Sequence, residues 1–253
     1  DFDKRVACKQ QNMKKYIKLI GIFAGIGLIA GVLAAIIQEP NLPDEMREQI
    51  LSQLGSMTVF YIIAGFQVMI YTIIASFIGL FLAEKLNLNV LRFNKQKLWI
   101  PVLFGTISAM IIVFGDAYVF ASFLPTTIES YDIDVIYLLT GIIYGGIIEE
   151  VLLRLLFLTL LLYGFQRFSK SKAVWTIHTA VIVSAVIFGL LHLPAVALLA
   201  DLTPMIVVRT ILLNALPGII FGYVYMKEGL WYSMLTHMVT HLVMQLVLMP
   251  IIF

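Results

Sequence analysis

The chain has 253 residues, of which 61% are hydrophobic and 13% are charged, and its formal net charge is +2. This composition excludes a water-soluble domain, and the sequence contains no basic stripe of the kind that binds nucleic acid. The single cysteine, Cys8, excludes an internal disulfide and a metal site made of several thiolates. We therefore expect a multi-pass protein of the cell membrane that is surrounded by lipid and does not bind nucleic acid.

Apolar segments long enough to cross a bilayer follow one another along the chain. A hydrocarbon core of about 30 Å needs roughly 20 helical residues. We expect an all-α polytopic transmembrane helix bundle of about seven spans, or eight if the chain continues beyond its present end. Residues 16–253 would form a single domain, and residues 1–15 would be either a cytoplasmic tail or a cloning remnant. The expected spans are Tyr16–Ile37, Met57–Leu82, Leu98–Leu124, Val135–Phe165, Val174–Leu199, Met205–Met226 and Leu230–Phe253.

The connections between these spans alternate in charge. Basic residues precede the first span and follow the second and fourth, whereas the other connections are acidic, so the positive-inside rule predicts a cytoplasmic N-terminus. In the first acidic connection, Met46, Ile50 and Leu54 recur at helical spacing. This pattern is compatible with a short interfacial helix and with an ordinary loop. Farther along, Pro217-Gly218 predicts a kink in the sixth span.

The fourth span contains two adjacent carboxylates, Glu149 and Glu150, and the guanidinium of Arg154. Each charge inside a bilayer costs roughly 2.5–3.5 kcal/mol, so such groups indicate function. On an α-helix Glu150 and Arg154 are four residues apart and can pair. Glu149 instead shares a stripe with Gly141 and Gly145, where another helix can approach closely. We therefore predict that Glu149 faces neighbouring helices and that Glu150 is structural.

Histidines occupy two of the later spans, the fifth and the seventh. His192 lies one turn after Phe188, while His237, His241 and Gln245 form a ladder at four-residue spacing. A carboxylate with imidazoles from different helices can bind a divalent metal or activate water. Structural roles are expected for the remaining intramembrane polar residues: His178 and Asn214 as contacts between helices, and Asp116 with Arg209 as an ion pair.

Three motifs follow one another in the C-terminal half: Glu149-Glu150-Val-Leu-Leu-Arg154, Phe188-Gly-Leu-Leu-His192, and His237 at the end of Gly-Leu-Trp-Tyr-Ser-Met-Leu-Thr-His. Together they resemble the motif set of the CPBP family, also called Abi, which includes type II CAAX prenyl endopeptidases and bacteriocin-processing proteases. The resemblance covers residues 135–245. It implies a membrane hydrolase that cuts a peptide bond in a lipidated or membrane-embedded peptide, with Glu149, His192 and His237 as catalytic residues.

The final motif departs from the family pattern, because His241 stands where the family usually has Asn or Asp. The resemblance implies that His241 either donates to the oxyanion or acts as a further metal ligand. Two mechanisms stay open at this point. One is metalloprotease chemistry with zinc held by Glu149, His192, His237 and His241, and the other is a metal-free, Glu149-activated water. Glu150, Arg154 and Phe188 would support the site.

The rival hypothesis is a non-catalytic membrane scaffold or a bacteriocin-immunity protein of the same fold. Such a protein would be expected to have lost Glu149, His192 or His237, and all three are present. Counted from the predicted helix ends, His237 lies about 12 Å deep, and Glu149 and His192 about twice as deep. Tilted or broken helices would account for this difference, and so would boundaries of the fourth and fifth spans that are wrong by one turn, which is the explanation we favour. The sequence indicates neither the substrate nor the oligomeric state.

Overall fold

The computed structural model describes residues 2–123, 132–169 and 173–253, with side chains from residue 14 onward. These residues form helices and connections and contain no strand, which confirms the all-α class. Leu124, the predicted end of the third span, lies outside them. The longer helices are α1 (Phe2–Gln38), α2 (Asp44–Leu54), α3 (Met57–Lys85), α4 (Trp99–Phe114), α6 (Thr159–Ser169), α7 (Val174–Leu191), α9 (Pro204–Glu228) and α10 (Leu230–Val243). Shorter elements are η1 (Glu39–Asn41), η2 (Lys95–Lys97), η3 (Gly115–Phe120), η4 (Ala121–Phe123), α5 (Val135–Thr140), η5 (Gly141–Glu149), η6 (Val151–Leu158), α8 (Leu193–Val196), η7 (Met244–Leu248) and α11 (Met249–Ile252).

Within the described residues, six helical stretches are long and apolar enough to cross a membrane, which matches six of the seven predicted spans. The predicted fourth span is present as a helical run from α5 through η5 and η6 to α6. The first helix, α1, begins at Phe2, so it includes most of the residues that were predicted to form an N-terminal tail. The six stretches are Lys14–Asn41, Met57–Lys85, Lys95–Phe123, Val174–Val196, Pro204–Glu228 and Leu230–Ile252.

The first acidic connection forms a helix, α2, and not a loop. Asp44 and Glu45 lie in its first turn, where negative charge favours a helix start, and Gly55 ends it with a left-handed φ of 76°. Arg47 pairs with Glu39 and ties the helix to the end of α1. Its position at the membrane interface stays a prediction.

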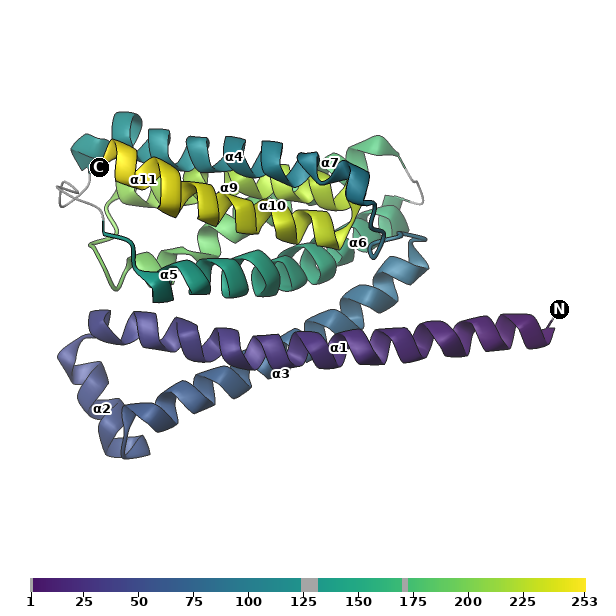
Figure 1. Cartoon of the computed structure of the whole chain (residues 1–253), viewed down its shortest axis with the longest axis horizontal. Coiled ribbons are helices and arrows are strands. Elements are labelled where there is room, and N and C mark those ends of the chain that lie inside the picture. The colour runs from purple at the N-terminus through teal and green to yellow at the C-terminus, as the bar shows by residue number, and fades with distance from the viewer. Residues whose placement is uncertain (1, 124–131, 170–172) are drawn as a thin grey trace.

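The helices α1, α2 and α3 lie along one side of the remaining bundle (Figure 1). A Cβ atom added at Gly31 of α1 would lie 2.5 Å from the carbonyl oxygen of Ala64 in α3. A Cβ atom added at Gly79 of α3 would lie 2.5 Å from the carbonyl oxygen of Leu155 in η6. Glycine therefore allows these backbones to approach closely, as small residues do in membrane helix packing.

The helix α10 packs against three neighbours, α4, α9 and η5. Its N-terminal turn is anchored from outside, because the N–H of Leu230 donates to the carbonyl of Val90 over 2.7 Å. Buried apolar side chains surround this junction, among them Leu155, Leu158 and Tyr225. The packing places the histidine ladder of α10 inside the bundle.

The helix that carries the two glutamates is wound as a π-helix on both sides of Glu150, in η5 and η6. The predicted spacing assumed an α-helix, so this winding is a difference from expectation. A π-helix closes hydrogen bonds from residue i to i+5, and successive side chains are separated by less than the 100° of an α-helix. Two adjacent side chains can then face the same neighbour. Glu149 and Glu150 both face the imidazole of His237 on α10.

Candidate active site

Glu149 lies between two imidazoles that come from different helices. Its Oε1 is 4.0 Å from Nε2 of His192, which follows the last residue of α7, and its Oε2 is 3.9 Å from Nε2 of His237 on α10. The side chain of Glu149 is 18% exposed and that of His192 is 31% exposed. The predicted grouping of these three residues is therefore present. Gaps of about 4 Å are too long for direct hydrogen bonds and have the width that one bridging water spans.

Glu150 is fully buried and holds His237 from the other side. Its Oε1 lies 3.0 Å from Nδ1 of His237, and its Oε2 accepts a hydrogen bond from the hydroxyl of Ser233. A carboxylate at Nδ1 fixes both the ring orientation and the tautomer, because it accepts the Nδ1–H. The Nε2 of His237 therefore carries the lone pair and faces Glu149.

Arg154 neutralises Glu150, as the four-residue spacing predicted. Its Nη1 lies 2.9 Å from Oε1 of Glu150, as an ion pair whose angles fall outside those of a hydrogen bond. Its Nη2 donates to the carbonyl of Gly218 over 3.2 Å, and its guanidinium carbon lies 4.6 Å from the ring centre of Phe188. Charges buried this deeply persist only when they are paired, so the two residues form one unit.

Phe188 links Arg154 to His192. The rings of Phe188 and His192 meet edge to face with centres 4.7 Å apart, and the carbonyl of Phe188 lies 2.8 Å from Nδ1 of His192. Since a carbonyl only accepts, Nδ1 carries the proton and Nε2 is free to accept. His192 and His237 thus present the same kind of atom, an unprotonated Nε2, to Glu149.

His241 stacks on His237, with ring centres 5.1 Å apart and an angle of 16° between the planes. A Cβ atom added at Gly141 or Gly145 would lie 2.5 or 2.7 Å from this imidazole, so the two glycines make room for it. The close helix approach predicted at these glycines is confirmed. Nε2 of Gln245 lies 3.3 Å from Nδ1 of His241. Because an amide nitrogen only donates, Nδ1 accepts and the ring proton of His241 lies on Nε2.

The donor atoms around Glu149 are those that zinc prefers, but their spacing is wider than a metal site requires. Zinc–ligand bonds of about 2.0 Å place neighbouring donors roughly 3.3 Å apart in a tetrahedron. In the part of the chain that the structure describes, no three histidine, cysteine or acidic side chains are arranged to hold a metal ion. Zinc at this site stays a prediction.

The sequence pattern did not reveal two supporting residues. Phe221 stacks on His237 with ring centres 4.5 Å apart, and Ser233 bridges Glu150 and the carbonyl of Phe221. Ser233 precedes His237 by four residues, so its place on the histidine face was a usable signal. Phe221 resembles the other apolar residues of its span, so the sequence contained no signal that could have identified it.

The other intramembrane polar residues have the predicted structural roles, with one exception. Arg209 binds Asp116 through two hydrogen bonds of 2.6 Å, and Nδ1 of His178 lies 2.5 Å from the hydroxyl of Tyr223 on α9. The exception is Asn214, whose amide donates over 2.8 Å to the carbonyl of Thr210 in its own helix. A carbonyl one turn away is always within reach of such a side chain, and this local bond replaces the predicted contact between helices.

The suspected boundary error is present at the end of the fourth span and absent from the start of the fifth. The fourth span ends at Ser169, one turn beyond the predicted Phe165, and α7 begins at Val174 as predicted. The extra turn increases the depth counted for Glu149, so the difference in counted depth remains. The side chains of Glu149, His192 and His237 meet in spite of that difference.

Comparison with known proteins adds an independent observation. Residues 131–243 match the family model described as type II CAAX prenyl endopeptidase Rce1-like. The comparisons with curated proteins and with solved structures give no match. The matched segment contains Glu149, Glu150, Arg154, His192, His237 and His241. This segment is therefore similar to the type II CAAX prenyl endopeptidase family, in agreement with the resemblance carried by the three motifs.

Proposed function

We propose that the protein is an integral-membrane endopeptidase in which Glu149 activates a water molecule. The observation that carries the proposal is the position of the Glu149 carboxylate, which faces Nε2 of His192 and Nε2 of His237 across gaps of 4.0 and 3.9 Å. A water in this space donates one hydrogen bond to the carboxylate and one to an imidazole. Both lone pairs of the water oxygen stay free, and one of them can attack an incoming carbonyl carbon.

The reaction that fits this arrangement is hydrolysis of a peptide bond. The water oxygen attacks the carbonyl carbon while Glu149 takes one of its protons, and the carbonyl electrons move onto oxygen. Glu149 then gives the proton to the leaving nitrogen as the C–N bond breaks. The products are a carboxylic acid and an amine, and Glu149 returns to its starting state.

The imidazoles have different tasks in this mechanism. His237 is held by Glu150 through Nδ1, and His192 is held by the carbonyl of Phe188, so each presents an Nε2 that can accept the second hydrogen bond of the water. His241 carries its proton on Nε2, since Gln245 occupies Nδ1. A Cβ atom added at Gly145 would lie 2.7 Å from Nε2 of His241 and 3.4 Å from Nε2 of His237, so the two atoms border one space. We assign to His241 the hydrogen bond that stabilises the oxyanion.

The proposed substrate is a lipidated or membrane-embedded peptide. The helices that carry His192 and His237 are long and apolar enough to cross a bilayer, so the substrate is expected to reach the site from lipid or from the membrane surface. The matching family model is described as a type II CAAX prenyl endopeptidase, which supports a lipidated peptide as the substrate.

The test is cleavage of a library of lipidated and unlipidated peptides by the full chain in nanodiscs. Glu149→Gln keeps the shape of the side chain but cannot take a proton, so cleavage should fall by about 10² to 10⁴-fold. Glu84→Gln, an exposed change at the end of α3, is the matched control and should cut like the wild type. Equal cleavage by Glu149→Gln would refute the mechanism. If no variant cuts while one partner protein co-purifies with all of them, the protein is a scaffold or an immunity protein.

A further inference from the structure

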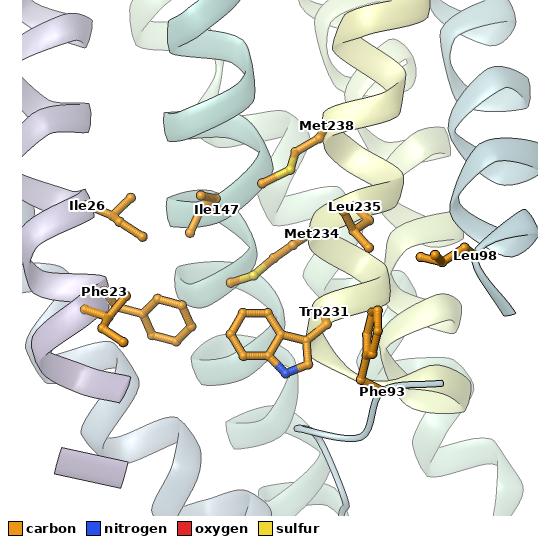
Figure 2. Close-up of a pocket in the computed structure, with 10 residues that line it drawn as sticks. Phe23, Ile26, Phe93, Leu98, Ile147, Trp231, Met234, Leu235 and Met238 are labelled. Atoms are coloured by element: carbon orange, nitrogen blue, oxygen red, sulfur yellow. The ribbon is translucent and has the colours of Figure 1, made fainter. Parts of the chain in front are cut away.

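A second feature of the molecule is an apolar pocket of about 570 Å³ between α1 and the pair formed by η5 and α10 (Figure 2). Its wall includes Phe23 and Ile26 of α1, Ile147 of η5, and Trp231 and Met238 of α10. Among the ten lining side chains, the indole N–H of Trp231 is the one polar N–H group. The volume lies in the range of small-molecule sites, and the lining suits a hydrocarbon chain.

The pocket is separate from the Glu149 site. Ile147 precedes Glu149 by two residues in η5, and therefore leaves the helix in a different direction. On α10, the side chain of Met238 packs directly against Gly146, which leaves no room for a Cβ atom there. The pocket lining also contains none of Glu149, His192 and His237, so the pocket and the reacting atoms are bordered by different side chains.

The pocket opens at the end of the bundle where the basic residues gather. Ile22 and Phe93 line it and are 49% and 57% exposed, which marks its mouth. Lys18 lies one turn before Ile22 on the same face of α1, and Lys95 follows Phe93 by two residues. Both lysines are exposed, and in the described chain neither forms an ion pair, whereas Lys97 nearby is paired with Glu228 at 2.8 Å.

We propose that this pocket binds one anionic phospholipid, with an acyl chain in the cavity and the phosphate between Lys18 and Lys95. An apolar cavity with two uncompensated cations at its mouth complements an amphiphile with a negative head. The mouth also lies at the predicted cytoplasmic end, where bilayers present anionic lipids. The proposal concerns binding and does not depend on the proposed peptidase activity.

Native mass spectrometry of the full chain tests this site, with phosphatidylglycerol and phosphatidylcholine of identical acyl chains as probes. The wild type should retain one phosphatidylglycerol with an affinity at least tenfold above that for phosphatidylcholine. Ile22→Trp fills the mouth and should weaken binding of phosphatidylglycerol about tenfold or more. Ile29→Trp is the matched control, because Ile29 is 55% exposed on the same helix and does not line the pocket.

A second set of variants tests the role of charge at the mouth of the pocket. All of these positions are exposed, so we expect their replacement to leave the fold intact. Lys18→Gln with Lys95→Gln should remove most of the preference for phosphatidylglycerol, about tenfold or more, because each basic residue near a lipid surface contributes to anionic binding. Arg167→Gln on α6, which packs against α3, α7 and η6, should keep the preference. Equal retention of both lipids by the wild type, or equal losses in the controls, would show that bulk lipid alone fills the pocket.

Discussion

The α1–α3 pair and the η5–α10 pair are both close helix contacts made at glycine, but different groups meet the glycine in each. At Gly31 the neighbour is the backbone of α3, whereas at Gly145 it is the imidazole of His241. The first contact serves packing alone, since a small residue brings two backbones together. The second uses the same missing side chain to admit a polar ring into the bundle. A small-residue stripe in a membrane helix therefore indicates close approach, and the partner decides whether the contact is structural or functional.

The two regions should differ most in how much stability depends on a buried charge. Arg154→Met leaves Glu150 buried without its cation, and we expect a loss of about 3–5 kcal/mol in the free energy of unfolding. Arg47→Met breaks the half-exposed pair with Glu39 near α2 and should cost at most about 1 kcal/mol. Chemical unfolding of both variants in one detergent measures the difference. Equal losses would mean that Arg154 and Glu150 do not form a coupled unit.

The next largest difference between the two helix pairs is expected when a glycine is replaced by alanine, which adds one methyl group. In Gly145→Ala the new Cβ atom would lie 2.7 Å from Nε2 of His241, so the ring has to move, and peptide cleavage should fall by about 10² if that ring serves the oxyanion. Gly21→Ala on α1 has no atom within 4 Å of its Cβ and should gain a few tenths to about 1 kcal/mol of stability with unchanged cleavage. Cleavage rates and thermal midpoints of both variants decide the matter. Full activity of Gly145→Ala would remove His241 from the mechanism.

A smaller effect is expected at Gln245, which is buried and contacts His241. Gln245→Leu removes the donor to Nδ1, so the proton of His241 is no longer restricted to Nε2. We expect kcat to fall about tenfold with KM nearly unchanged, because oxyanion stabilisation acts on the transition state. Gln245→Asn, which keeps the amide on a shorter side chain, should recover part of kcat. A change confined to KM would assign Gln245 to substrate binding instead.

The smallest expected effect is that of metal removal. If Glu149 activates water without a metal, incubation with a strong zinc chelator should leave cleavage by the full chain unchanged. Metal content measured on the same sample supplies the control. Loss of cleavage that returns on adding zinc would establish the zinc alternative at Glu149, His192 and His237.

Much of the site was predictable from the sequence, because charged residues are rare in apolar spans and therefore conspicuous. Glu149 was conspicuous in this way, and the resemblance to a family motif set selected it together with His192 and His237. Their grouping is present in the structure. The roles of Ser233 and Phe221 were not identified, since a serine or a phenylalanine in a membrane helix has many ordinary explanations. The π-helical winding around Glu150 was also missed, because the hydrophobic pattern of a short segment does not distinguish helix types.

The sequence by itself determined the all-α class and the positions of the spans, because a chain in lipid has to satisfy its backbone hydrogen bonds within each helix. It also determined which polar side chains lie inside the bundle. Only the tertiary structure decided which of their atoms meet. Whether Glu149 or Glu150 binds Nδ1 of His237 depends on helix rotation, stagger and winding, and an apolar run is compatible with many values of each.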